Sequence, residues 1–284
     1  MSGPKPTGAR FDLPYLGVGV GFRVPHYGQV VRERPEMDWF EVISENFMGD
    51  GGSPAWHLER LADAYPVVCH GVSANLGGAE DPDHTRRLAR LVQQLDPPWV
   101  SDHLCWTRAD GVASHDLLPL PYVPEIIEHV ADRIKALQDR LGRPFAVENL
   151  SSYATFKASQ MPEWEFLGRV AERADCAILL DVNNVFVSAC NHGFDGQRYL
   201  DNVPLERVVQ VHLAGHSVTP THRLDTHDHP VCDEVWALYE ALLQRRGPVT
   251  TLIEWDANIP SFERLQQEAA QARDRIAALE PQDV

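Results

Sequence analysis

Short β-rich runs and helical segments alternate eight times along this chain. The β-rich runs occupy residues 16–22, 39–45, 66–72, 99–104, 145–149, 177–182, 208–215 and 250–256. Strands that alternate with helices in this number predict an α/β fold, a closed parallel (β/α)8 barrel. A doubly wound sheet is the competing fold, but no glycine fingerprint follows the first run.

The segments between the runs carry helix signals. In residues 123–142, apolar side chains recur at close to a 3.6-residue period, and the pattern ends at Gly142. Residues 81–95 begin with Asp81-Pro82, and proline suits the first turn of a helix. Residues 161–174 and 233–247 behave in the same way.

Length and composition favour one domain. The 284 residues, 44% of them hydrophobic, can bury the core of one large barrel as well as the cores of two small domains. The sequence has no obvious linker or internal repeat. We therefore expect one barrel domain over residues 13–279, with flexible ends at 1–12 and 280–284.

Charge and cysteine content restrict the partners and the compartment. Lys and Arg total 25 against 41 Asp and Glu, a net charge of −16 that argues against nucleic acid as a partner. The start has no signal-peptide pattern, and no run approaches the roughly 20 apolar residues that span a bilayer. Five cysteines without paired spacing predict free thiols and a cytoplasmic protein.

Seven of the eight runs end in a side chain that can bind a metal ion. These residues are Glu45, His70, His103, Glu148, Asp181, His212 and Glu254. Any one of them alone is more often an ordinary hydrogen-bonded or exposed residue. The C-terminal strand ends of such a barrel meet at one mouth, where this many acids would repel each other without a cation. The pattern predicts a metal site there.

The segment RLDTHDHPV at residues 223–231 crowds two aspartates and two histidines. Side chains of an extended backbone alternate between faces, so Asp225 and His227 are expected on one face. Asp228 and His229 would face away, as supporting groups or as part of a solvated loop. The same alternation places Glu254 and Asp256 together.

Two other spacings are informative. His70 and Cys69 occupy opposite faces of one strand, so a metal-facing His70 makes Cys69 a core thiol. Asp181 and Asn184 are three residues apart at a strand-to-helix turn, where both side chains can reach the rim.

The candidate ligands exceed the needs of one ion. They are His70, His103, Glu148, Asp181, Asn184, His212, Asp225, His227 and Glu254. One ion takes four to six ligands, some of them water, so the set predicts two or three ions with a bridging carboxylate. Imidazole and carboxylate without cysteine suit iron, zinc or manganese, and disfavour a structural zinc.

The order of these ligands resembles the trinuclear site of the endonuclease IV-like and xylose isomerase-like TIM barrels. More specifically, the chain resembles the multinuclear non-haem iron-dependent oxidative enzymes, the family of the methanobactin biosynthesis oxidase and of the enzyme that acts on 3-thiaglutamate precursors (MbnB/TglH-like). The resemblance rests on CHGVSANLGG, SDHLCW, ENLSSY, LLDVNNVFVSACNHG, VHLAGH, DTHDHPV and IEWD, and it runs from about residue 13 to residue 275.

The resemblance implies a distribution of the ligands over three irons. His70, His103 and Glu148 hold the first iron, and Glu148 bridges to a second. The other ligands of the second iron are Asp181, His212 and Glu254. The third position takes Asn184, Asp225 and His227. Asn184 stands where the endonuclease branch has histidine, and because an amide is the weaker ligand, this position is expected to be partly filled.

The resemblance also implies the activity, which is oxidation of cysteine in a ribosomally synthesised precursor peptide during natural-product maturation. The cofactors are two or three iron ions in mixed Fe(II) and Fe(III) states, with dioxygen as cosubstrate. The substrate thiolate binds one iron, which lowers the pKa of the thiol. The implied partners are the precursor peptide and a leader-peptide-binding protein, with no nucleic acid and no membrane.

Three more residues receive roles. Asp256 is either the general base for a substrate amide proton or a residue that holds a histidine nitrogen. Glu45 and His216 are candidate substrate-binding residues. Two other functions stay open: a zinc- or manganese-dependent hydrolase or sugar isomerase on the same barrel, and a catalytically idle subunit that binds a metal and a partner.

Overall fold

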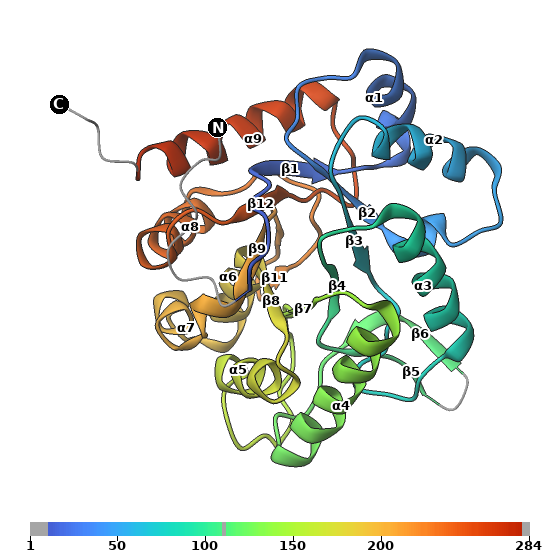
Figure 1. Ribbon diagram of the computed structural model, residues 1–284. Helices are drawn as coiled ribbons and strands as arrows, with labels where there is room; N and C mark the ends of the chain where they lie inside the picture. Colours follow the sequence, from blue (N-terminus) through green and yellow to red (C-terminus); the bar gives the residue numbers. More distant parts are fainter. Residues whose placement is uncertain (1–10, 110–111, 280–284) are drawn as a thin grey trace.

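Eight parallel strands close into a barrel in the computed structural model, which describes residues 11–109 and 112–279 (Figure 1). The strands are β1 (Val18–Gly21), β2 (Phe40–Ile43), β3 (Val67–Gly71), β4 (Val100–His103), β7 (Phe145–Glu148), β8 (Ala177–Asp181), β9 (Val208–Leu213) and β12 (Thr250–Ile253). Around the barrel the order is β1-β12-β9-β8-β7-β4-β3-β2. Each strand falls inside one predicted run, so the predicted fold is confirmed.

Helices surround the barrel, as Figure 1 shows. They are α1 (Tyr27–Glu33), α2 (Gly52–Ala62), α3 (Pro82–Leu95), α4 (Pro124–Leu141), α5 (Glu163–Ala174), α6 (Val182–His192), α7 (Gly196–Asn202), α8 (Asp233–Arg246) and α9 (Phe262–Ala277). The four predicted helices agree with α3, α4, α5 and α8 to within two residues at each end. Asp81 caps α3 by accepting from the backbone of Asp83 and His84, as its position before proline predicts. In the described part of the chain, no helix combines the length and apolar character that crossing a membrane requires.

Two apolar clusters divide the interior. The larger cluster fills the space between strands and helices and includes Cys69. Burial raises the pKa of the Cys69 thiol to about 12, and the prediction of a core thiol is confirmed. The smaller cluster is made of Trp39, Val68, Trp99, Ala146, Ala177, Leu179, Val209 and Leu252. Phe11, Leu13 and Leu16 pack against it.

The small cluster is an apolar plug inside the barrel. Several of its members stand two residues before a polar side chain on the same strand: Val68 before His70, Ala146 before Glu148, Leu179 before Asp181, and Leu252 before Glu254. Because strand side chains alternate, the polar side chains form the next inward layer above the plug. This layering confines the polar residues to the C-terminal mouth. The predicted flexible ends lie outside the described residues, apart from Phe11 and Asp12.

Two short hairpins at the mouth were not predicted. One pairs β5 (Trp106–Ala109) with β6 (Val112–Leu118), and the other pairs β10 (Ser217–Val218) with β11 (Arg223–Leu224). Each follows a barrel strand, so each lies at the C-terminal side. Strands of two residues, or strands with the irregular register of β5 and β6, leave too little alternation in the sequence to be recognised.

Gly19 is needed at the plug. A Cβ atom at this position would lie 2.6 Å from ring atoms of Trp39 and 2.6 Å from the Trp39 carbonyl oxygen. Gly19→Ala is therefore expected to lower the free energy of unfolding by about 1–3 kcal/mol, the usual cost of overpacking a close-packed core. Chemical denaturation measures this change. Gly28→Ala in α1 is the control, and equal stability losses in both variants would contradict the argument.

Candidate metal centre

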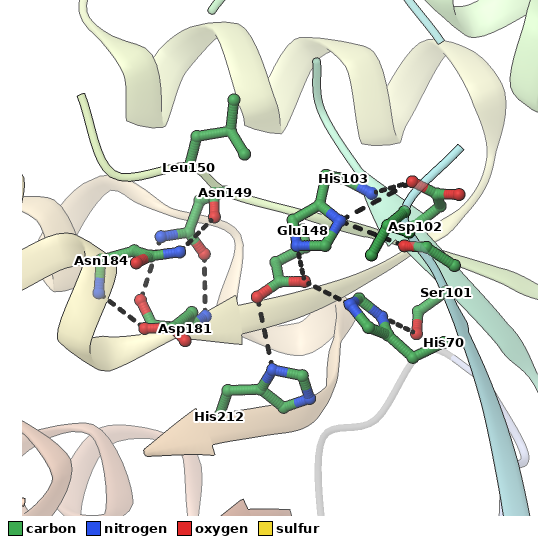
Figure 2. Close-up of polar contacts among 12 residues, drawn as sticks. His70, Ser101, Asp102, His103, Glu148, Asn149, Leu150, Asp181, Asn184 and His212 are labelled. Atoms are coloured by element: carbon green, nitrogen blue, oxygen red, sulfur yellow. Dashed lines mark hydrogen bonds and ion pairs between the residues drawn. The ribbon is translucent and has the colours of Figure 1, made fainter. Parts of the chain in front are cut away.

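The strand ends bring six predicted ligands together above the plug. Figure 2 shows His70, His103, Glu148, Asp181 and His212 among them. Two groups of ligand atoms each lie within 4.8 Å of one another. The first group is His70, His103 and Glu148, and the second is Glu148, Asp181, His212 and Glu254. These groups match the two ligand sets that the resemblance implies for the first and second irons.

Glu148 belongs to both groups. Its Oε2 lies 3.3 Å from His70 Nε2 and 3.2 Å from His103 Nε2. Its Oε1 lies 3.4 Å from His212 Nδ1, which is also 2.9 Å from Glu254 Oε2. One carboxylate therefore faces nitrogen ligands on two sides, which is the arrangement of a bridging ligand.

Several buried polar atoms of the cluster lack hydrogen bonds in the described part of the chain. They are Glu148 Oε2, Asp181 Oδ2, Asn184 Oδ1, His212 Nδ1 and His227 Nε2. Glu148 Oε2, His212 Nδ1 and His227 Nε2 face oppositely charged groups without hydrogen-bond geometry. Buried polar atoms without a hydrogen bond cost free energy, and five in one place need a common explanation. Cations bound among them would satisfy all five. The donors are nitrogen and oxygen without sulfur, so they fit iron, zinc or manganese.

In each histidine of the two groups, the ring nitrogen that points away from Glu148 has its own protein partner. His70 Nδ1 lies 2.8 Å from Ser101 Oγ, and His103 Nδ1 lies 3.1 Å from the Gly71 carbonyl oxygen. His212 Nε2 lies 3.1 Å from Glu41 Oε2. Histidines that bind metals use one nitrogen for the ion and hydrogen-bond through the other, and these three follow that pattern.

Glu41 was not predicted from the sequence as a residue of the site. It is completely buried, and its Oε2 also accepts from Gln210 Nε2 at 2.6 Å. The signal was present, because Glu41 is a carboxylate in the middle of an apolar strand and shares a face with Trp39. Glu41 stands in the middle of its strand, whereas the predicted ligands on the barrel strands stand at the strand ends.

Glu41→Gln tests this support. The change removes the charge that holds His212 Nε2 and keeps the size of the side chain. We expect metal to bind about 10- to 100-fold more weakly, the usual effect of removing a carboxylate behind a ligating histidine. Competition with a chromogenic chelator measures the affinity, and an unchanged dissociation constant would contradict the assigned role.

Charges in the cluster shift each other's pKa values. Burial lowers the pKa of His103, but the Glu148 carboxylate and Asp102 outweigh it and raise this pKa to about 10. Burial raises the pKa of Asp181 well above its usual range, despite the opposing effect of His227. Burial opposes ionisation of Glu254, yet His212 and His227 hold its pKa well below normal. Without a metal, protons stay bound within the cluster, and a bound cation would displace them.

Two members of the third predicted set, Asp225 and His227, lie together, while the third group of candidate ligands in the described chain is His227, Glu254 and Asp256. His227 Nε2 lies 2.6 Å from Asp225 Oδ1 and 3.9 Å from Asp181 Oδ2. Asn184 donates its backbone NH to Asp181 Oδ1 at 2.6 Å, and its side-chain nitrogen donates to the Asn149 carbonyl at 3.1 Å. The amide oxygen of Asn184 is the atom left without a partner.

The reason given for the Asp225–His227 pairing was wrong. This segment is not a strand, and His227 has a φ of 44°, in the left-handed region. The left-handed backbone at His227 replaces the extended backbone whose alternation was expected to pair the two side chains. Asp228 accepts from Thr226 and from Asn258, and His229 is exposed, so both face away from the cluster as predicted.

Asp256 lies beside His227, as the spacing to Glu254 predicts. Its Oδ2 is 3.1 Å from His227 Nδ1 and its Oδ1 is 2.5 Å from Arg23 Nη2. These are the contacts of a residue that holds a histidine nitrogen. The side chain is also 41% exposed, which leaves it accessible from the mouth. Its role as a general base stays a prediction.

Glu45 and His216 have partners outside the two ligand groups. β2 ends at Ile43, so Glu45 lies in the following 3-10 helix (Ser44–Phe47) and not at the strand end. Its Oε1 lies 2.9 Å from His84 Nε2. His216 Nδ1 lies 2.9 Å from Asn183 Oδ1, and Asn183 donates to Asp225 at 2.7 Å. Substrate contact by either residue stays a prediction.

The fold and the cluster together define a (β/α)8 barrel of the xylose isomerase-like kind with a candidate multinuclear metal centre. Among solved structures, endonuclease IV from Thermus thermophilus is similar, with a TM-score of 0.60 at 17% identity over 93% of this chain and 99% of that one. D-psicose 3-epimerase from Clostridium cellulolyticum has a TM-score of 0.58 at 10% identity over 92% and 98%. At these identities the likeness shows the fold alone.

Sequence comparison identifies the family. The profile described as "RiPP precursor modification enzyme MbnB/TglH/ChrH" matches residues 17–277. The chain therefore belongs to this family of enzymes, which modify ribosomally made precursor peptides. A UPF0276 protein of Anaeromyxobacter sp. (strain Fw109-5) is 50% identical over 271 residues, 94% of this chain and 95% of the relative. One from Vibrio parahaemolyticus is 42% identical over 261 residues, 90% and 91%.

Proposed function

We propose that this protein is an iron- and dioxygen-dependent oxidoreductase that modifies cysteine residues of a precursor peptide. The observation that carries the proposal is the pair of buried ligand groups that share Glu148, in a chain of the precursor-modifying family. A partner protein that binds the leader peptide of the precursor completes the proposal.

The ligand residues are assigned to separate metal positions in this proposal. Two positions are assigned to the groups that share Glu148, and a third to Asn184, Asp225 and His227. Bound iron would supply redox chemistry with dioxygen and would lower the pKa of a substrate thiol by direct contact. The protein contributes fixed ligand directions from rigid strand ends, and the plug keeps water from reaching the cluster through the barrel.

Asp256 is proposed to accept a proton from a substrate amide. Its side chain is 41% exposed at the mouth. Burial and the nearby Glu254 carboxylate raise the pKa of Asp256, but His227 and Arg23 outweigh them and the net pKa is low. The carboxylate is therefore ionised at neutral pH and able to accept a proton, although a low pKa makes it a modest base.

The test begins with the metal. Protein loaded anaerobically with Fe(II) is expected to hold two or three irons per chain by elemental analysis. Peptides encoded by short cysteine-containing reading frames beside the gene are then incubated with it, with and without dioxygen. A mass change that requires iron, dioxygen and cysteine supports the proposal, and the same peptide with serine for cysteine is the control.

Two outcomes would contradict the proposal. One is protein that takes up only zinc from iron-replete, reducing medium. The other is a mass change of the peptide that proceeds equally without dioxygen, or with zinc in place of iron. Either result favours a hydrolytic or isomerising barrel enzyme.

A further inference from the structure

One arginine is buried beside the acidic cluster. Arg23 follows β1 and is 8% exposed. Its Nε donates to the Trp255 carbonyl oxygen at 3.1 Å, and its Nη2 lies 2.5 Å from Asp256 Oδ1 and 3.7 Å from Glu254 Oε1. Strands β1 and β12 are neighbours in the barrel, so the Arg23 guanidinium after β1 binds Trp255 and Asp256, the residues that follow β12.

Asp256 connects Arg23 to His227. The second oxygen of Asp256 lies 3.1 Å from His227 Nδ1, and the Asp256 backbone NH donates to the His227 carbonyl at 2.8 Å. His227 belongs to no strand and has a left-handed backbone, so no ladder of hydrogen bonds fixes its ring. Its orientation depends on Asp225 at Nε2 and, at Nδ1, on Asp256 and on Glu254 Oε2, which also lies 3.1 Å away and whose other oxygen faces Arg23.

We propose that Arg23 is the positioning residue of the third metal position: it fixes Asp256, and Asp256 turns His227 Nε2 toward Asp225. This inference rests on the proposed three-position centre. His70 and His103 are held by Ser101 and Gly71, which Arg23 does not contact. Loss of Arg23 should therefore empty the His227 position and leave the position at His70 and His103 filled.

The contacts of Arg23 with Trp255 and Asp256 depend on the planar shape of the guanidinium as well as on its charge. One side chain binds a carbonyl and a carboxylate through different nitrogens, which lysine cannot reproduce. The group also lies close against Gly21. A Cβ atom there would be 3.0 Å from Arg23 Cζ and 3.2 Å from Nη1. Gly21→Ala should therefore push the guanidinium aside without removing it.

The experiment counts and locates metal ions without any peptide. Wild type, Arg23→Met, Arg23→Lys and Gly21→Ala are titrated anaerobically with Fe(II), and the bound ions are located by anomalous diffraction at the iron edge. We expect Arg23→Met to bind one ion per chain about 10- to 100-fold more weakly, with that ion missing beside His227. Arg23→Lys and Gly21→Ala should fall between Arg23→Met and wild type.

The matched control is Arg273→Met. Arg273 contacts the opposite end of the same strand, with Nε 3.1 Å from Asp38 Oδ2 and Nη2 donating to the Val18 carbonyl at 3.3 Å. This variant should lose stability in thermal melts and keep every metal affinity. A merely structural role for Arg23 would give the same result in Arg23→Met.

Three results would overturn the inference. They are equal affinities in wild type and Arg23→Met, loss of all ions together from a folded Arg23→Met protein, and loss of an ion from the His70 and His103 position. If Arg23→Met does not fold, Gly21→Ala decides by the same criteria. Wild-type protein that binds no iron would contradict the proposed function itself, which separates the two failures.

Discussion

Glu148→Gln is expected to remove two metal positions with one substitution and to abolish turnover. Glu148 is 1% exposed and faces His70 and His103 with one oxygen and His212 with the other. An amide of the same size offers one neutral oxygen and turns an NH2 group toward imidazole nitrogens. Replacing a residue that hydrogen-bonds to a metal ligand weakens metal affinity by about 10- to 100-fold. Loss of a ligand shared by two metal positions should therefore weaken it by more than about 100-fold.

Elemental analysis after anaerobic loading measures this loss. Glu268→Gln is the control, because Glu268 is equally buried but lies in α9, where it pairs with Arg264. The control should keep its iron. Wild-type iron content in folded Glu148→Gln protein would show that the two groups do not share a bridging carboxylate.

Metal binding is expected to raise the melting temperature, and the increase should grow with pH. A metal at 100 times its dissociation constant stabilises the folded state by about 2.7 kcal/mol per ion. For a domain of this size that is a shift of roughly 5–11 °C per ion. Calorimetry of chelator-treated and metal-loaded protein measures the difference.

The pH dependence follows from His103. In the metal-free protein its pKa is raised to about 10, so its contribution to stability is full below about pH 6.5 and is lost as pH rises toward 10. A metal-bound imidazole carries no proton on the ligating nitrogen, so metal affinity rises over the same range. The gap between the two melting temperatures should therefore widen from pH 6.5 to pH 9. A gap that narrows would contradict protonation of the metal-free site, and Glu148→Gln should show little gap at any pH.

The predictions from sequence succeeded where the pattern is local. Strand and helix positions follow from periodicity within single segments. The opposite faces of Cys69 and His70 on β3 followed from the alternation of side chains along a strand. The ligand candidates were found because each stands at the end of its own strand, and a barrel gathers all such ends at one mouth.

The failures concern contacts between distant segments. Arg23 and Asp256 are 233 positions apart, and they meet only because the barrel closes β1 against β12. Glu41 and His212 are 171 positions apart and meet across the barrel interior. The left-handed backbone at His227 was not predicted, because its carbonyl oxygen accepts hydrogen bonds from Asp256 and Ala257, which belong to another segment.

The amino-acid sequence alone therefore determined the barrel, the opposite faces of Cys69 and His70 and the residues available as ligands, since strand alternation and strand ends are local properties of a few neighbouring positions. Only the tertiary structure decided which carboxylate is shared, which groups hold each histidine and how the segment after β11 turns. These features depend on side chains from distant segments approaching within 2.5–3.4 Å, and closure of the barrel, not local propensity, sets such distances.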